Sequence, residues 1–493
     1  MTNAAQKNQS GNKKPRTAIT PTREEDFAEW YQQVVKAADL GESSPTRGAM
    51  IVKPYGWAIW ENMQSIFDGW LKEYGVQNCS FPTLIPVSFL SKEADHVEGF
   101  AKECAVVTHH RLEAKDGELV PAESAKLEEP YVVRPTSETI IGDAMSRWIQ
   151  SYRDLPLQLN QWNNVFRWEM RTRLFLRTSE FFWHEGHNAF AGHEGAKSDC
   201  LTIINMYEKF FIEYLAIDGF KGIKTAEERF PGANETYAFE CMMQDGKALQ
   251  AATAHDLGDN FAKTFNITYQ GQDEQEHFCH TTSWAFTTRM IGALIMMHGD
   301  DDGAIMPPHI APHQIVILPV VKEDTREKVE QYCAELQEKL KAKGLRVKLD
   351  NRDLRTPDKM WDAVKSGIPV RVEVGGREVD DNQLTFVRRD LGKPSKTTVS
   401  VDEFLDQAEK VLQDMHDDML KRVREFRDQN THEGKSVEDI REFFSSGKTG
   451  FISVPTTLLQ DDKLEAVMSE FSLTTRNMPF KDDGKTVLIA KAY

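Results

Sequence analysis

Four arginines stand among aromatic residues in one short stretch of the chain, FRWEMRTRLFLRTSEFFWHEGH at 166–187. Guanidinium groups bind anionic oxygens in a planar, bidentate geometry, so this stretch indicates a site for phosphate or carboxylate groups. Alternation predicts a strand with Val165, Arg167, Glu169 and Arg171 on one face. A short loop, RTRLF, and a second aromatic strand would complete a long antiparallel hairpin. A solvated sheet face with ion pairs would show the same charge pattern.

A further arginine lies where a predicted strand meets a predicted helix. In SWAFTTRMIGALIMM the first residues favour a strand, 290–297 favour a small apolar helix, and Arg289 stands between them. A cation fixed at such a junction can hold a polyphosphate in a bidentate manner. A surface arginine that caps a core helix is the alternative for this stretch taken alone.

Neither the histidines nor the cysteines have the spacing of a metal site. His184 and His187 in HEGH are three residues apart, which differs from the H-E-x-x-H pattern of zinc enzymes. No C-x-x-C pair occurs, so we expect reduced core thiols rather than disulfides or a thiolate zinc site. The six cysteines are Cys79, Cys104, Cys200, Cys241, Cys279 and Cys333.

Helices and strands of recognisable pattern surround these residues. Apolar residues recur at three- and four-residue steps through 56–74 and 136–150, which predicts two amphipathic helices, the first ended by Gly75. Pro82 restricts a strand in 76–86 to an edge or interface position. Beyond residue 314, IVILPVV, a helical stretch at 325–343 and LRVKLD alternate as in a small α/β domain.

Length and composition describe an ordinary globular protein. The 493 residues are enough for about three domains, and 40% of them are hydrophobic. The formal net charge of -17 argues against indiscriminate nucleic-acid binding. No run of about 18 apolar residues occurs and the N-terminus lacks an apolar signal core, so we expect no membrane contact and a cytoplasmic location. Residues 1–21 are polar and predict a disordered tail.

The order of these features resembles motifs one, two and three of the class II aminoacyl-tRNA synthetases. A long helix leads into a strand with Pro82, a hairpin carries F-R-x-E, and a strand–helix junction carries Arg289. The finer resemblance is to the prolyl-tRNA synthetase family, in its compact archaeal and eukaryotic-like form. The stretches that carry it are RPTSE (134–138), FRWE (166–169), FLRTSEFFWHEGH (175–187), ALQAATAHDLG (248–258) and TTSWAFTTR (281–289).

The resemblance implies an α+β fold with three domains. A class II catalytic domain at 22–308 would hold an antiparallel sheet flanked by helices, followed by an α/β anticodon-binding domain at 309–407 and a small α/β C-terminal domain at 408–493. Only some ninety residues, 191–280, separate motifs two and three, so no inserted editing domain is expected. Many relatives carry a four-cysteine zinc site in the C-terminal domain, but no cysteine follows Cys333, and we predict no structural zinc.

The resemblance also implies the chemistry. Proline and ATP would form prolyl-adenylate and pyrophosphate, with Mg²⁺ on the phosphates through ligands that the sequence does not identify, and proline would then pass to tRNA(Pro). Arg167 would bridge the α-phosphate and the proline carboxylate, Arg289 would hold the terminal phosphates, and these two are the predicted catalytic residues. The residues implied for ATP are Arg167, Glu169, Arg177, Thr178, Gln250, Thr253, Thr287 and Arg289, and those implied for proline are Thr136, Glu138, Arg167, Trp183 and His255.

The second lobe supplies candidates for tRNA contact. Residues 341–371 hold nine Lys or Arg against four Asp, a local balance of +5 in an acidic chain. Arg352, Arg355 and Lys359 are the candidates, although a solvated helix face would look similar. The resemblance further implies a homodimer, and a terminal Tyr493 is typical of relatives whose C-terminal carboxylate approaches the active site.

Two other functions remain open on the sequence. A synthetase-like protein could bind tRNA or a regulatory partner without activating an amino acid, but such a protein has no use for the complete set of triphosphate-binding residues. An enzyme for threonine or serine is the other alternative. Glu138 and His255 in their motifs favour proline.

Overall fold

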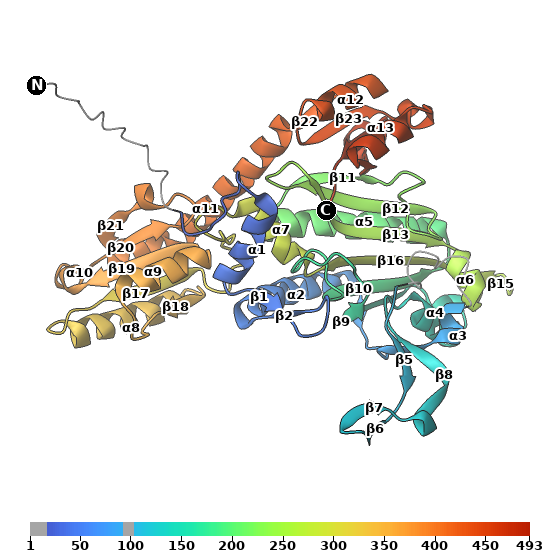
Figure 1. Cartoon of the computed structure of the whole chain (residues 1–493), viewed down its shortest axis with the longest axis horizontal. Helices are drawn as coiled ribbons and strands as arrows, with labels where there is room; N and C mark the ends of the chain where they lie inside the picture. Colours follow the sequence, from blue (N-terminus) through green and yellow to red (C-terminus); the bar gives the residue numbers. More distant parts are fainter. Residues whose placement is uncertain (1–16, 92–102) are drawn as a thin grey trace, which may run out of the picture.

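An eight-stranded sheet forms the centre of the molecule in the computed structural model, which describes residues 17–91 and 103–493. All neighbouring strands are antiparallel except the last pair, β9 and β3, which is parallel. In spatial order the strands are β25 (Met478–Pro479), β11 (Gly219–Ile223), β12 (Glu235–Met242), β13 (Ala248–Gly258), β16 (His280–Thr287), β10 (Glu180–Phe190), β9 (Leu157–Phe166) and β3 (Gln77–Asn78). Figure 1 shows this sheet between layers of helices, as expected for a class II core.

The largest hydrophobic core lies between this sheet and four helices. Side chains of α1 (Phe27–Ala37), α2 (Pro54–Tyr74), α5 (His193–Leu215) and α7 (Arg289–His298) pack against inward-facing residues of β12, β13 and β16. The predicted helix at 56–74 is confirmed, and Gly75 ends it with a left-handed φ of 103°. A smaller core joins the sheet to α4 (Glu138–Trp148) and α6 (Asn260–Phe265), which confirms the second predicted helix.

Short elements complete this part of the chain. Residues 191–280 supply α5, α6 and three strands of the central sheet, so the stretch between motifs two and three forms part of the core. The hairpin of β6 and β7 protrudes from the body (Figure 1). The remaining elements are β1 (Gly41–Ser43), β2 (Met50–Val52), β4 (Leu84–Pro86), α3 (Val87–Ser91), β5 (Val106–His109), β6 (Leu112–Lys115), β7 (Glu118–Pro121), β8 (Lys126–Val133), β14 (Thr268–Gln270) and β15 (Glu276–Phe278).

The predicted hairpin is present, but its first strand is shorter than expected. β9 and β10 pair in antiparallel register as far as Phe166 and Glu180. Beyond Phe166 the strand prediction is wrong, because the amide of Trp168 donates to the carbonyl of Glu103, 2.8 Å away, instead of to β10. Arg173 and Arg177 then close a tight loop through reciprocal backbone hydrogen bonds of 2.7 and 2.9 Å.

A second sheet lies in a separate α/β unit. Its strand order is β18-β17-β19-β20-β21, with β17 parallel to β18 and β19 and the other pairs antiparallel. Buried residues of this sheet and of its helices form their own core. The elements are β17 (Ile315–Val320), α8 (Arg326–Ala342), β18 (Val347–Leu349), α9 (Thr356–Lys365), β19 (Val370–Gly375), α10 (Gly376–Asp380), β20 (Gln383–Arg388) and β21 (Thr397–Ser400).

One long helix, α11 (Val401–Gln429), connects this unit to the C-terminal unit. Phe404 and Leu412 pack into the α/β core, whereas Met415 and Met419 pack beside Ala216 of the central unit. The expected boundary at 407/408 therefore falls inside a continuous helix. The C-terminal unit has a four-stranded sheet and consists of β22 (Thr431–Glu433), α12 (Val437–Ser445), β23 (Phe451–Pro455), α13 (Leu464–Phe471), β24 (Thr474–Thr475) and β26 (Thr486–Ala490).

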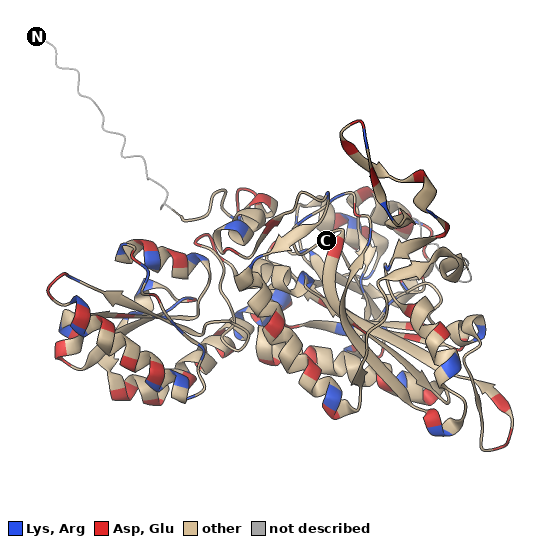
Figure 2. Cartoon of the chain, turned by 90° about the horizontal axis from the view of Figure 1, so that it is seen from below, with Lys and Arg blue, Asp and Glu red and all other residues tan. Residues whose placement is uncertain are grey.

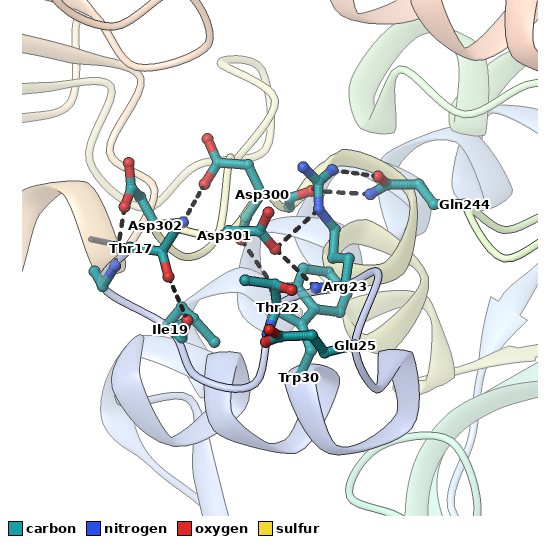
Figure 3. Close-up of polar contacts among 12 residues, drawn as sticks. Thr17, Ile19, Thr22, Arg23, Glu25, Trp30, Gln244, Asp300, Asp301 and Asp302 are labelled. Atoms are coloured by element: carbon teal, nitrogen blue, oxygen red, sulfur yellow. Dashed lines mark hydrogen bonds and ion pairs between the residues drawn. The ribbon is translucent and has the colours of Figure 1, made fainter. Parts of the chain in front are cut away.

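The N-terminal prediction is wrong for the residues that the structure describes. Residues 1–16 of the expected tail lie outside the described part of the chain, but 17–21 pack against the body. Ile19 is buried, its amide donates to the carbonyl of Asp301 at 2.9 Å, and the amide of Ala18 donates to the Asp302 carboxylate at 3.0 Å. Figure 3 shows these contacts, with Arg23 beside Asp301. The loop that contains Asp301 and Asp302 thus supplies hydrogen-bond acceptors for 17–21. The polar composition of the N-terminal segment does not indicate these distant partners.

Candidate active site

One cavity of about 570 Å³ opens over the central sheet, and every residue proposed for ATP or proline lines it. These residues come from the hairpin of β9 and β10, from β13, from the junction of β16 with α7, and from the start of α4. They are Thr136, Glu138, Arg167, Glu169, Arg177, Thr178, Trp183, Gln250, Thr253, His255, Thr287 and Arg289. Segments far apart in sequence thus place their polar side chains around one space.

Three guanidinium groups of the predicted site, those of Arg167, Arg177 and Arg289, line the cavity and influence one another. Burial, together with the nearby positive charges of Arg177 and Arg167, lowers the pKa of Arg289 to about 10. Burial likewise lowers the pKa of Arg167, although Glu138 and Glu185 oppose the shift. Cations that depress one another's pKa favour an anion between them, because the anion relieves their mutual repulsion.

Arg167 is held in one orientation by its surroundings. Its Nε donates to the carbonyl of Pro135 at 3.0 Å. Its guanidinium carbon lies 5.3 Å from the ring centre of Trp183 and 5.5 Å from that of Phe181, within the range of cation–π attraction. Such a fixed group needs little reorganisation when it binds an anion.

Arg289 begins α7 and is fixed by backbone acceptors. Its amide donates to Thr287 Oγ1 at 2.9 Å, and its Nε donates to the carbonyl of Leu176 at 3.2 Å. Leu176 belongs to the loop that Arg173 and Arg177 close, so motif two and motif three meet here. The strand–helix junction predicted from the sequence therefore places this cation at the cavity rather than on the outer surface.

A carboxylate and a neutral imidazole face the other part of the cavity. Thr136 Oγ1 donates to Glu138, whose side chain is buried at the start of α4. His255 lies against the ring of Phe230, with centroids 4.5 Å apart, and its Nδ1 is 3.0 Å from Thr236 Oγ1. Burial lowers the pKa of His255 to about 3, and Lys224 and other cations add to the effect, so the imidazole is neutral at pH 7.

Several cavity residues were not identified from the sequence. Glu185 and His187 form a buried pair, with Oε2 and Nε2 3.0 Å apart. They share a face of β10 with Trp183, a two-residue alternation that the HEGH motif contains. His184 points to the other face and contacts Tyr207 Oη at 3.0 Å. Within the described ranges, no group of three or more His, Cys, Asp or Glu side chains is arranged to hold a metal ion.

The three residues predicted to contact tRNA differ in their exposure to solvent. Arg352 pairs with Asp350 at 2.7 Å and Arg355 pairs with Asp358 at 2.9 Å, both near the surface. Lys359 is buried, and its ammonium donates to the carbonyl of Asp350 at 3.1 Å, so it is not positioned to contact a phosphate. Figure 2 shows acidic and basic residues interspersed over the helices of this unit, so the basic sequence run does not form an uninterrupted basic face.

Tyr493 packs on the central unit, with its amide donating to the carbonyl of Ala248 at 3.0 Å and its hydroxyl to Asp245 at 2.5 Å. Cys79 and Cys104 are only partly buried, whereas the other four cysteines are buried, and within the described ranges none of the six forms a disulfide. No helix in the described ranges is both long and apolar enough to cross a membrane.

Buried histidines predict a loss of stability in weak acid. Burial lowers the pKa of His184, His255 and His298 to about 3 and of His416 to about 4, against an ordinary value near 6.5. Below pH 6.5 the unfolded chain binds protons that the folded chain does not, so the free energy of unfolding falls by up to about 1.4 kcal/mol per pH unit for each histidine. The pKa of His187 is raised, so protonation of this residue stabilises the folded chain in acid. This stabilisation is already complete below the ordinary pKa of histidine and does not grow at lower pH.

Denaturant unfolding at pH 7.0, 6.0 and 5.0 would measure this slope. The window lies above the ordinary pKa of carboxylates, about 4, so most carboxylates stay ionised in it. Burial raises the pKa of Asp199 and of Asp256, and these two groups oppose the effect of the four histidines. A free energy of unfolding that stays constant from pH 7.0 to 5.0 would contradict the prediction. His416→Asn should reduce the slope, because it removes one of the contributing groups.

Comparison with known proteins gives two matches to family descriptions. Residues 122–298 match the tRNA synthetase class II core domain of the G, H, P, S and T group, and residues 314–411 match an anticodon binding domain. The chain is 49% identical to a proline–tRNA ligase of Protochlamydia amoebophila, over 96% of this chain and 95% of that protein. It is 46% identical to one of Bdellovibrio bacteriovorus (97% and 99%) and 49% identical to one of Paramagnetospirillum magneticum (96% and 95%). With this cavity, this sheet and this extent of identity, the chain belongs to the proline–tRNA ligase family of class II tRNA synthetases.

Proposed function

We propose that this chain activates proline with ATP and then transfers it to tRNA(Pro). The observation that carries the proposal is the single cavity in which Arg167, Arg177 and Arg289 lie together with Glu138 and His255. A triphosphate needs the three cations, and an amino acid with a charged amine needs the carboxylate and the neutral acceptor. The catalytic unit in this proposal runs from 17 to 308.

Activation is an in-line displacement at phosphorus. A carboxylate oxygen of proline forms a bond to the α-phosphorus of ATP while the bond from that phosphorus to the pyrophosphate oxygen breaks. The carboxylate is already an anion, so no general base is needed and positioning with charge neutralisation is the main work. Arg167, fixed over Trp183, would bind the α-phosphate and the carboxylate. Arg289, with Arg177 and Thr287, would stabilise the departing phosphates.

Proline binding uses the opposite part of the cavity. The ring nitrogen of proline carries a positive charge and two N–H donors. Glu138 supplies a carboxylate and Thr136 a further oxygen. His255 stays neutral, so it accepts a hydrogen bond without repelling the ammonium. Trp183 and Phe230 supply apolar surface for the ring.

The cavity residues not yet assigned a role are suited to contact the nucleoside part of ATP. Glu169, Thr178, Gln250 and Thr253 line the cavity, where they would contact the adenosine. Mg²⁺ generally takes one or two carboxylates together with phosphate oxygens and water. The phosphates of ATP would therefore bring most of its ligands, and it would neutralise charge on the leaving pyrophosphate. Its protein ligands are not assigned.

Transfer requires the α/β unit to hold tRNA. A hydroxyl at the 3′ end of tRNA(Pro) attacks the carbonyl of prolyl-adenylate, and AMP leaves. Arg352 and Arg355 are the candidates for phosphate contact, and Trp361, 39% exposed on the adjoining helix α9, offers a ring on which a base can stack.

Strand β3, exposed at the edge of the central sheet, supports the expected homodimer. The cytoplasmic location stays a prediction.

Amino-acid-dependent pyrophosphate exchange tests the function. The purified chain, ATP, Mg²⁺ and labelled pyrophosphate are incubated with proline, alanine, cysteine, threonine or serine. We expect proline to give the fastest exchange, with weaker exchange for alanine and cysteine, because small apolar differences discriminate by only about 1–3 kcal/mol. Exchange led by threonine or serine would refute the substrate. No exchange with any of them would favour a tRNA-binding protein without activation.

A further inference from the structure

The C-terminal unit forms part of the central sheet. Strand β25 pairs with β11 through Gly222 and Ile223 and becomes the outermost strand on that side. A Cβ at Gly222 would lie 2.2 Å from the carbonyl oxygen of Met478, so the two backbones approach closely because residue 222 is glycine. Asn477 is fully buried, and its amide donates to the carbonyls of Phe220 and Ala238 at 2.8 and 3.2 Å.

The residue before Asn477 makes a buried ion pair with the central sheet. Arg476 binds Glu240 of β12 with one edge of its guanidinium, Nε to Oε2 at 3.1 Å and Nη2 to Oε1 and Oε2 at 3.1 and 2.9 Å. Glu240 is 0% exposed and Arg476 is 6% exposed. Its remaining nitrogen, Nη1, donates to Thr474 Oγ1 at 2.7 Å. A contact of this burial and geometry is costly to break, because each partner would lose its bidentate counter-ion inside the protein.

Glu240 also contacts a lysine that lines the cavity. Lys224 Nζ lies 3.4 Å from Glu240 Oε1, and its side chain is 4% exposed. In the sheet, Glu240 is the partner of Gln250, which lines the same cavity. One carboxylate under the cavity floor is thus shared by a cation from the C-terminal unit and a cation of the site.

We propose that Arg476 is a positioning residue for nucleotide binding: it neutralises Glu240, so that Lys224, which lies 3.4 Å from the same carboxylate and lines the cavity, is not the only cation that Glu240 holds. Without Arg476, the buried carboxylate has Lys224 as its nearest cation and pulls it away from the anionic ligand. The negative charge of Glu240 would also act on Gln250, its partner in the sheet, and on Arg289, and both of these residues line the cavity. This inference rests on the proposed use of the cavity for ATP.

The test is ATP affinity, measured by calorimetric titration with Mg²⁺ and by exchange kinetics at varied ATP and varied proline. For Arg476→Ala we expect the Kd and KM for ATP to rise about tenfold, with a smaller change in the KM for proline. Glu240→Gln in the same chain removes the unpaired charge, so E240Q/R476A should return close to wild type. Arg476→Lys loses the bidentate geometry but keeps the positive charge, and because the proposal rests on that charge it should stay within about threefold of wild type.

The matched control is Arg424→Ala, which removes another ion pair between the C-terminal half and the central unit, Arg424 with Asp218 at 2.5 Å, away from the cavity. We expect it to leave ATP affinity unchanged. If Arg476→Ala does not fold, ATP affinity is compared between wild type and the R476K and E240Q/R476A variants. ATP binding much weaker than wild type in either variant overturns the proposal. Unchanged affinity in Arg476→Ala, or no recovery in the double variant, overturns it too. A wild-type chain that binds ATP without proline-dependent exchange would instead refute the proposed function.

Discussion

Replacing Arg167 by alanine is expected to lower kcat/KM for proline-dependent pyrophosphate exchange by about 10³-fold or more. Loss of a single charge-stabilising donor in an active site typically costs about 10²–10³ in rate, and in the proposed function Arg167, which lines the cavity, contacts two anionic groups. Arg167→Lys should recover only part of the loss, because an ammonium cannot bind two oxygens in the geometry of a guanidinium. Exchange rates at varied ATP and varied proline measure the effect.

Arg171 provides the matched control for this substitution. It belongs to the same arginine-rich stretch but is exposed on the loop after β9. We expect Arg171→Ala to keep exchange within about twofold of wild type, since surface substitutions rarely disturb a site. Equal losses from Arg167→Ala and Arg171→Ala would show that general positive charge, not the fixed position of Arg167, attracts the substrates.

Replacing Glu138 by glutamine is expected to raise the KM for proline by about 10²–10³-fold with little change in the KM for ATP. The amide has nearly the shape of the carboxylate but lacks the charge that the ammonium of proline requires. Glu138 also stands at the first turn of α4, where an acidic residue favours the helix by about 0.3–1 kcal/mol through its dipole. A purely structural role would therefore reduce stability and leave the KM for proline unchanged.

Asp143→Asn on the same helix separates these two roles. Asp143 forms an ion pair with Arg147 at the outer side of α4. We expect this variant to keep the wild-type KM for proline, whatever its small effect on stability. Thermal unfolding of both variants, followed by circular dichroism, shows whether either has lost the fold. A normal KM for proline in Glu138→Gln would contradict the proposed role.

Sequence periodicity predicted the elements that position the site. The apolar stripes of α2 and α4 and the alternation in β9 and β10 are local signals, because each element buries one side of itself in the nearest core. The end of β9 could not be predicted in this way. The strand ends there because the amide of Trp168 donates to the carbonyl of Glu103, a residue far from it in sequence.

Contacts made by the folded chain account for the other differences. The packing of 17–21 depends on Asp301 and Asp302, which are distant in sequence. Lys359 is buried within its own unit, where its ammonium donates to the carbonyl of Asp350. Arg476 and Glu240 are 236 residues apart, and neither belongs to a recognisable motif. Side-chain type alone cannot tell a buried cation from an exposed one, because burial is decided by which segments the fold brings together.

The position of β25 has a consequence for how the protein is made. Translation delivers the chain from its first residue, so β11 of the nascent chain has an unpaired outer edge until Met478 and Pro479 leave the ribosome. The sheet that carries the cavity is therefore completed only when almost the whole chain has been synthesised. A prematurely terminated product would lack this strand, and its exposed edge would be open to aggregation and to degradation.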